Sequence, residues 1–301
     1  SEVKSADYRI EVNVAGATVA GYGEHLKVPD TWVRDYAKLR SKNEVAGQID
    51  SVFLLLTVLA MLTVLGLRIR RGDVRWKAAT ILGAIMFALM ALSQFNSLPS
   101  ELYAYDTTTS FGGFLAKIVL AAIGAGLGSA LLIFLLTASA EPGYRERFPD
   151  KLSLTSLLRL RAFRSREFFV ASLVGVTLTC FFFAYENVFY LIANALGAWA
   201  PREVAYSDLL STAFPWVYVL FFGFLPAISE EFISRMFSIP FFEKIFKSTV
   251  LAVVVAAFIW GFGHAGYPNQ PFWIRGLEVG LAGIVFGVVL LRFGIASVII
   301  C

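Results

Sequence analysis

The sequence predicts an all-α membrane protein, a polytopic bundle of about eight transmembrane helices with a small α+β module outside the membrane at its N-terminal end. Of its 301 residues, 57% are hydrophobic and only 16% are charged, whereas soluble domains have roughly 25% charged residues. The mean hydropathy is +0.69. Several apolar stretches reach about 18 residues or more, enough to cross about 30 Å of hydrocarbon as a helix.

Residues 1–47 form the predicted extramembrane module. Apolar and polar residues alternate over residues 8–14, which is the period of a β-strand, and Ala15-Gly16 offers a turn before a second strand over residues 18–22. Pro29 suits the first turn of a following helix. Because a hairpin and one helix have little core of their own, we expect them to pack on the membrane domain or on sequence that precedes Ser1.

Eight apolar spans follow the module. They are predicted at residues 49–67, 78–95, 113–137, 168–187, 209–236, 248–265 and 276–291 and from residue 295 onward. Glycines at close spacing predict tight helix contacts at Gly124 and Gly128 in the third span, and along the series Gly276, Gly280, Gly283 and Gly287 in the seventh. We divide the chain into residues 1–47, an N-terminal transmembrane part at 48–199 and a C-terminal core at 200–301.

The basic loops indicate an orientation. Arginines and lysines concentrate between spans one and two, three and four, and five and six, so the positive-inside rule places these loops in the cytoplasm and the N-terminal module outside. Lys38, Arg40 and Lys42 argue weakly for the opposite orientation. The net charge of +4 therefore reflects topology, and no nucleic acid is expected as a partner. The segment from Leu154 to Phe163 is either an interfacial amphipathic helix or a simple basic linker.

The chemistry-bearing residues lie in the fifth span. Carboxylates at membrane depth are costly and usually face a protein-lined or water-filled cavity. Glu231 and Arg235 stand at i and i+4 on a helix, which predicts a buried structural ion pair. Glu230 is rotated by about 100° from Glu231 and lacks this partner, so we assign it to chemistry, with Ser234 as a hydrogen-bond candidate.

His264 follows in the next span. Measured from the loop at residues 244–247, Glu230 and His264 lie about 21 and 26 Å into the membrane along ideal helices. Spans joined by a short loop are usually neighbours, so the two side chains are expected to meet. A carboxylate beside an imidazole can activate water, with or without a metal ion.

These residues resemble the motifs of a known family. Glu230-Glu231-Phe232-Ile233-Ser234-Arg235 resembles the EExxxR motif of the CAAX-protease and bacteriocin-processing family, which includes the Rce1-type prenyl endopeptidases. The segment from Trp260 to His264 is similar to the second motif, FxxxH, with Trp in place of Phe. Since the replacement keeps an aromatic ring, we expect it to matter little. The resemblance covers about residues 209–301.

The resemblance implies an intramembrane endopeptidase, a metalloprotease or glutamate-dependent enzyme of a bacterial inner membrane. Glu230 would be the base, His264 would orient water or bind metal, and Glu231 is kept as a further catalytic candidate. The resemblance also implies a divalent metal ion, for which we expect zinc at His264 and Glu230. The implied partners are the lipid bilayer and a peptide or protein substrate, and the sequence assigns no oligomeric state.

The third motif of the family, HxxxN, has no counterpart here, because the chain contains only His25 and His264. The chain also lacks an initiator Met and ends at Cys301 inside an apolar run, so we expect a segment of a longer protein. The alternative is a degenerate relative without activity.

Three functions are consistent with the residues. The leading hypothesis is hydrolysis of a peptide bond in a prenylated, bacteriocin-like or otherwise membrane-associated peptide. The second is a non-catalytic bacteriocin-immunity or membrane scaffold protein that binds a peptide with the same bundle. The third is a transporter that uses Glu230 as a proton carrier, for which the sequence shows no inverted repeat.

Overall fold

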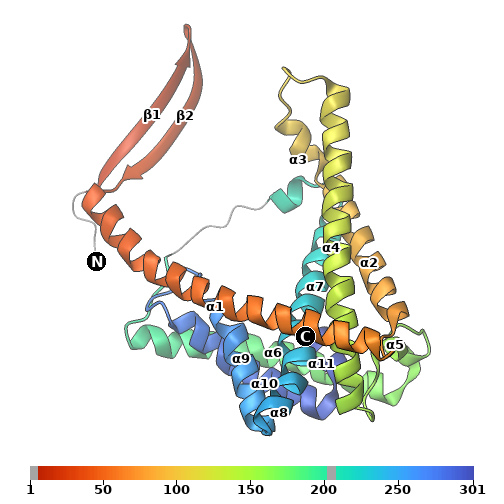
Figure 1. Cartoon of the computed structure of the whole chain (residues 1–301). Coiled ribbons are helices and arrows are strands. Elements are labelled where there is room, and N and C mark those ends of the chain that lie inside the picture. The colour runs from red at the N-terminus through yellow and green to blue at the C-terminus, as the bar shows by residue number, and fades with distance from the viewer. Residues whose placement is uncertain (1–5, 202–207) are drawn as a thin grey trace.

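The computed structural model describes residues 6–201 and 208–301 and shows a helical bundle with a β-hairpin at its N-terminal end (Figure 1). Residues 1–5 of the expected module and residues 202–207 of the expected C-terminal core lie outside the described residues. The elements in chain order are β1 (Asp7–Ala15), β2 (Thr18–Lys27), α1 (Asp30–Arg70), α2 (Trp76–Asn96), α3 (Leu98–Tyr103), α4 (Phe111–Arg147), α5 (Leu154–Leu157), η1 (Ala162–Arg164), α6 (Arg166–Ala195), η2 (Asp208–Ser211), α7 (Pro215–Glu231), η3 (Phe232–Phe237), α8 (Ser238–Phe246), α9 (Thr249–Phe262), α10 (Ile274–Phe293) and α11 (Ile295–Ile300).

Six helices of the described chain are long and apolar enough to cross a membrane. They comprise α1, α2 with α3, α4, α6, the continuous stretch from α7 through α8, and α10. The apolar α9 is shorter, at 14 residues, and α11 begins where the eighth span is predicted. The predicted fold class, a helical membrane bundle with a small N-terminal strand module, is confirmed.

The hairpin forms as predicted, but it stands apart from the bundle (Figure 1). β1 and β2 pair antiparallel, with Ala15 opposite Thr18, so the turn is the two-residue Gly16-Ala17. Gly16 has φ of 64°, a left-handed conformation that favours glycine. Side chains on both faces are exposed, including Ile10 at 58%. Of the two expected ways to cover the hairpin, packing on the membrane domain is therefore wrong, and packing on sequence that precedes Ser1 stays a prediction.

The helix of the N-terminal module and the first span are one helix. We expected a helix after Pro29 and a separate span from residue 49, but α1 runs without a break for 41 residues. No proline interrupts this stretch, and a lone glycine such as Gly47 weakens a helix without ending it. Near the start of α1, the rings of Trp32 and Tyr36 stack with centroids 5.3 Å apart. The division of the chain at residue 47 stays a prediction.

The glycine series of α10 serves helix packing, as predicted. A Cβ at Gly261 of α9 would lie 2.5 Å from the backbone nitrogen of Gly280, so the two helices approach to backbone contact. A Cβ at Gly280 would in turn meet the ring of Phe258 at 2.7 Å. This close approach places the C-terminal end of α9, and the residues that follow it, against α10.

The predicted contact at Gly124 and Gly128 is wrong. A Cβ at either position would meet nothing within 4 Å. The close contact between α2 and α4 instead uses Gly126, which faces the ring of Phe87, and Gly83, which faces the backbone of Ala130. The glycine spacing correctly indicated that α4 makes a close helix contact. The contact face of α4, however, lies about half a turn away from the predicted face.

The basic segment between α4 and α6 is not a continuous amphipathic helix. It contains only the four residues of α5 and the three residues of η1, which favours the linker alternative. Leu154 is buried, and Thr155 accepts a hydrogen bond from Arg75, so the linker packs on the end of α2.

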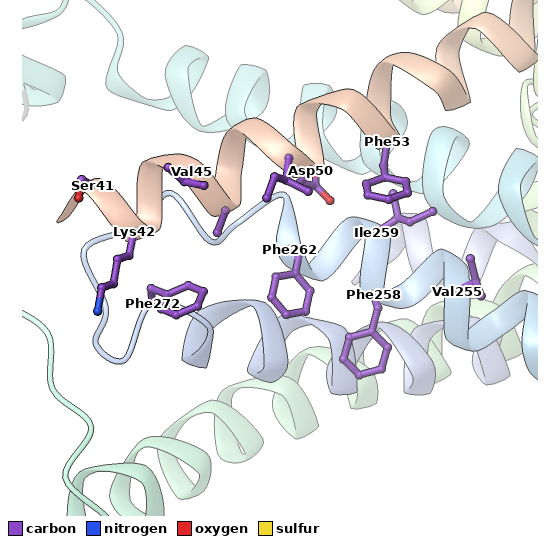
Figure 2. Close-up of a pocket in the computed structure, with 12 residues that line it drawn as sticks. Ser41, Lys42, Val45, Asp50, Phe53, Val255, Phe258, Ile259, Phe262 and Phe272 are labelled. Carbon is purple, nitrogen blue, oxygen red and sulfur yellow. The ribbon is translucent and has the colours of Figure 1, made fainter. Parts of the chain in front are cut away.

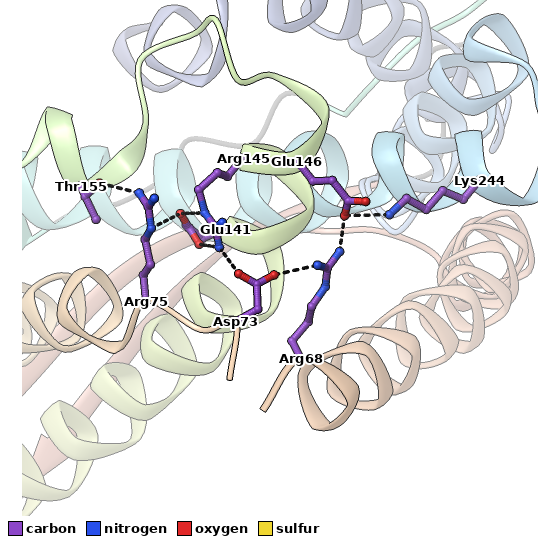
Figure 3. A network of polar contacts seen from close by, with 8 residues as sticks. All are labelled: Arg68, Asp73, Arg75, Glu141, Arg145, Glu146, Thr155 and Lys244. Carbon is purple, nitrogen blue, oxygen red and sulfur yellow. Dashed lines mark hydrogen bonds and ion pairs between the residues drawn. The ribbon is translucent and has the colours of Figure 1, made fainter. Parts of the chain in front are cut away.

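A network of charged side chains joins the helix ends near this linker (Figure 3). Asp73, in the loop between α1 and α2, accepts hydrogen bonds from Arg145 of α4 at 2.7 Å and from Arg68 of α1 at 2.8 Å. The hydrogen bond from Arg145 holds the pKa of Asp73 below its usual range. Glu146 extends the network by accepting from Arg68 and from Lys244 of α8. The network fixes the relative positions of α1, α4 and α8 on the side of the bundle with the basic loops.

Candidate functional site

The backbone changes its winding at the two glutamates. α7 ends at Glu231, and the next six residues, Phe232–Phe237, form a π-helix before α8 continues the chain. Ser238 Oγ donates to the carbonyl oxygen of Ile233 at 2.7 Å within this wider turn. Pro226 interrupts the hydrogen-bond ladder of α7 one turn before Glu230. Short π-helical segments are rare and are frequently found at functional sites.

Glu231 and Arg235 form the ion pair that their i, i+4 spacing predicts. Arg235 Nη1 lies 2.8 Å from Glu231 Oε1, and the two side chains are only 1% and 7% exposed. The guanidinium carbon of Arg235 lies 3.7 Å from the centre of the Trp260 ring on α9, a cation–π contact. Among the described residues, Glu231 Oε2 and Arg235 Nη2 have no hydrogen-bond partner. Through the cation–π contact with Trp260, the ion pair holds α9 against the π-helix.

Glu230 has a partner that the sequence did not reveal. Its Oε2 accepts a hydrogen bond of 2.8 Å from the indole Nε1 of Trp260. The expected bond to Ser234 is not formed within the described chain, and the partner is the neutral indole in its place. Unlike the buried Glu231, Glu230 is half-buried. The two adjacent glutamates therefore differ in both partner and exposure.

The ring of His264 is held in one tautomer by the backbone. Its Nδ1 lies 3.0 Å from the carbonyl oxygen of Trp260, and because a carbonyl oxygen can only accept, Nδ1 must carry the hydrogen. The Nε2 atom of a neutral ring then keeps its lone pair and can accept a proton or a hydrogen bond. The ring also lies edge-on to the Trp260 ring, with centroids 5.4 Å apart.

Glu230, Trp260 and His264 line two cavities at once. The larger, of about 790 Å³, is bordered by α6, α7, α10 and α11, and it also contacts Glu231 and Arg275. The smaller, of about 280 Å³, lies on the α1 side. The structure thus brings Glu230 and His264 to the same pair of cavities, as their similar depth predicted.

Asp50 is a candidate that sequence reasoning missed. It lies on α1 with 6% exposure and lines the smaller cavity together with Glu230 and His264. Its Oδ2 would be 3.2 Å from a Cβ at Gly263. The signal was present in the sequence, because Asp50 is an acidic residue in an apolar span, the same criterion that singled out Glu230.

Arg275 is the second missed residue. It lines the larger cavity from the start of α10, and its Nη1 pairs with Glu186 of α6 at 2.9 Å and with the buried Glu278 at 2.6 Å. The pair with Glu278 has the local i, i+3 spacing of a helix, but the pair with Glu186 depends on α6 and α10 lying side by side.

An apolar groove runs along α1 beside the site (Figure 2). It has a volume of about 780 Å³ and lies between α1 and α9, with the rings of Phe53, Phe258, Phe262 and Phe272 around it. Asp50 and Ile259 line both this groove and the smaller cavity. The groove therefore adjoins the candidate site.

Asn43 fixes the loop that follows His264. It is fully buried on α1, and its Nδ2 donates to the carbonyl oxygens of Ala265 and Tyr267 at 3.0 and 2.9 Å. Its Oδ1 accepts from Gln270 Nε2 at 2.6 Å. This anchoring explains how an irregular segment at the end of α9 keeps the imidazole in a fixed place.

The described residues do not make up a metal site. They contain no group of three or more His, Cys, Asp or Glu side chains placed to hold a metal ion. Glu230 and His264 are donors of the kind that zinc binds, but a catalytic zinc ion normally has three protein ligands. The zinc ion expected at these residues stays a prediction.

The fold and the site define a polytopic helical membrane protein with a glutamate–tryptophan–histidine cluster inside its bundle. Residues 212–301 match the model of the family described as type II CAAX prenyl endopeptidase Rce1-like. The family is one of peptidases. With six candidate spans, the chain is an integral membrane protein.

A relative is the sporulation-killing factor biosynthesis protein SkfC of Bacillus subtilis (strain 168). It is 30% identical over 74 residues, which is 25% of this chain and 15% of that protein. The chain thus aligns with only a small part of this relative's length. No solved structure matches the chain.

Proposed function

We propose that the protein is an intramembrane endopeptidase in which Glu230 and His264 activate a water molecule. The observation that carries the proposal is that both side chains line the same two cavities and are held there by one residue, Trp260. The match of this region to a family of prenyl endopeptidases supports the reaction class.

The side chains suffice for a balanced hydrolysis. The Glu230 carboxylate takes a proton from water while the water oxygen bonds to the carbonyl carbon of the scissile peptide. His264 Nε2 accepts a hydrogen bond from the other O–H of the same water and so orients its lone pair. When the tetrahedral intermediate collapses, the C–N bond breaks and Glu230 returns the proton to the leaving amine.

We propose a membrane-associated peptide as the substrate. The groove along α1 is lined mainly by apolar side chains and adjoins the smaller cavity at Asp50, so an apolar segment or a lipid chain can lie there while the peptide reaches Glu230. Prenylated peptides and bacteriocin-like peptides both have this chemistry. The match to a family described as prenyl endopeptidases supports the first of these two classes.

Replacement of His264 tests the proposal. We expect His264→Ala to lower cleavage by about a hundredfold or more, because general acid–base groups contribute about 10²- to 10⁴-fold. The measurement is mass spectrometry of farnesylated CAAX peptides and hydrophobic bacteriocin precursor peptides incubated with the protein in liposomes. The matched control is His25→Ala, the other histidine of the chain, which lies in the exposed hairpin.

Two results would contradict the proposal. Equal cleavage by His264→Ala and wild type would remove His264 from the reaction. Absence of cleavage by wild type, combined with tight and unchanged peptide binding in both variants, would instead favour the non-catalytic binding protein.

We also propose an orientation in the bacterial inner membrane, with the basic loops in the cytoplasm and the hairpin outside. Cysteines introduced at exposed Ala17 and exposed Leu160 test it. A membrane-impermeant maleimide should label Ala17→Cys in intact spheroplasts and Leu160→Cys only after lysis. The reverse pattern would invert the topology, and the unmodified chain controls for labelling of Cys180 and Cys301.

A further inference from the structure

Trp260 contacts each of the other site residues in a different way. Its indole Nε1 donates to Glu230 Oε2 at 2.8 Å, and its carbonyl oxygen accepts from His264 Nδ1 at 3.0 Å. The face of its ring lies under the guanidinium of Arg235, at 3.7 Å. The first two contacts reach the candidate base and the imidazole, and of these two only the hydrogen bond to Glu230 depends on the side chain at position 260.

The surroundings fix the plane of the indole ring. On one side, Arg235 is tied to Glu231, and on another, the ring of Phe286 lies with its centroid 6.0 Å away. A Cβ at Gly283 would lie 3.1 Å from Cε3 of Trp260, so the absence of a side chain there makes room for the ring. A ring held in this way directs its N–H group at one fixed point, and the structure places a carboxylate oxygen at that point.

A general base gains from such a fixed donor. A carboxylate has two oxygens and several rotamers, and a hydrogen bond to one oxygen restricts the rotamer and leaves the other oxygen for water. No described residue donates to Glu230 Oε1. We infer that the indole N–H of Trp260 is the positioning donor that holds Glu230 in place as the general base, an inference that rests on the proposed peptidase function.

Trp260 is the position at which the chain departs from the second motif. The family pattern has Phe at the position of Trp260, and we expected the exchange to matter little. A phenyl ring can supply the contacts to Arg235 and Phe286, but it has no N–H group. In this chain, the residue that departs from the pattern is therefore the one that binds Glu230.

The kinetic test replaces the N–H group and keeps an aromatic ring. We expect Trp260→Phe to lower kcat by about tenfold or more, the effect of losing one hydrogen bond to a charged group, with KM within about twofold of wild type. Trp216→Phe is the matched control, since Trp216 is 60% exposed on α7, and it should leave both constants unchanged.

Because Phe is smaller than Trp, a second variant carries 3-benzothienylalanine at position 260, which keeps the bicyclic shape and lacks the N–H group. A merely structural role for Trp260 predicts normal kcat in this second variant, and that result would overturn the inference.

A spectroscopic test does not depend on activity. The indole N–H proton of Trp260 is identified in the NMR spectrum by its disappearance in Trp260→Phe. It should move upfield in Glu230→Ala, which removes the acceptor, and stay in place in Glu44→Ala, which removes an exposed glutamate of α1. If the chemical shift of the indole N–H proton is unchanged in Glu230→Ala, the positioning contact is overturned. A signal that responds in a protein without peptidase activity confirms the contact while the proposed function fails, so the two failures are distinguishable.

Discussion

Glu230→Gln is expected to lower peptide hydrolysis by about a thousandfold, because a neutral amide cannot take a proton from water and a general base contributes about 10²- to 10⁴-fold. The amide oxygen can still accept the Trp260 hydrogen bond, so the fold should be retained. The measurement is kcat on a cleaved peptide, with helix content by circular dichroism and the thermal midpoint measured on the same samples.

The neighbouring glutamate provides the sharpest contrast. In Glu231→Gln the activity loss should follow a loss of stability, because the buried Arg235 loses its counter-charge. Glu44→Gln makes the same chemical change at an exposed position and should behave as wild type. If Glu230→Gln keeps full activity while Glu231→Gln abolishes it in a stable protein, the roles of the two glutamates are the reverse of our assignment.

Arg235→Met is expected to destabilise the protein by about 3–5 kcal/mol, the range measured when one partner of a buried ion pair is removed. The substitution leaves the Glu231 carboxylate in a site that is 7% exposed, without a positive charge beside it. It also removes the cation that packs on the Trp260 ring. The free energy of unfolding in detergent micelles, from denaturant titration, measures the effect.

A second change separates the stranded charge from the loss of packing. The double variant Glu231→Gln, Arg235→Met removes both charges and should recover a large part of the lost stability. Lys38→Met breaks an exposed pair with Asp35, whose side chains are 81% and 78% exposed, and should change stability by less than about 1 kcal/mol. A double variant as unstable as Arg235→Met alone would show that packing, and not the uncompensated carboxylate, causes the loss.

The match of residues 212–301 to the Rce1-like family supports the proposed reaction class, and it names no site residues. The structure supplies what the motifs do not contain, which is the tautomer of His264, the donor to Glu230 and the cavities that both residues line.

Much of the fold was predictable from local patterns. The hairpin, the spans and the Glu231–Arg235 pair each depend on residues close together in the sequence, where strand and helix periods fix which side chains share a face. Most of the predictions that were wrong concern contacts between elements. The contact face between α2 and α4, the isolation of the hairpin and the partner of Glu230 depend on how separate helices and strands are arranged in space.

The sequence by itself determined that this is a membrane protein with a carboxylate and an imidazole at a similar depth, because hydropathy and helical rise are properties of each span alone. Only the tertiary structure decided that Trp260 bonds to Glu230, that Asp50 of α1 lines the same cavity, and that Asn43 anchors the loop after His264. These contacts join residues 30 to more than 200 positions apart, and their formation depends on the packing of α1, α7, α9 and α10, which no local period encodes.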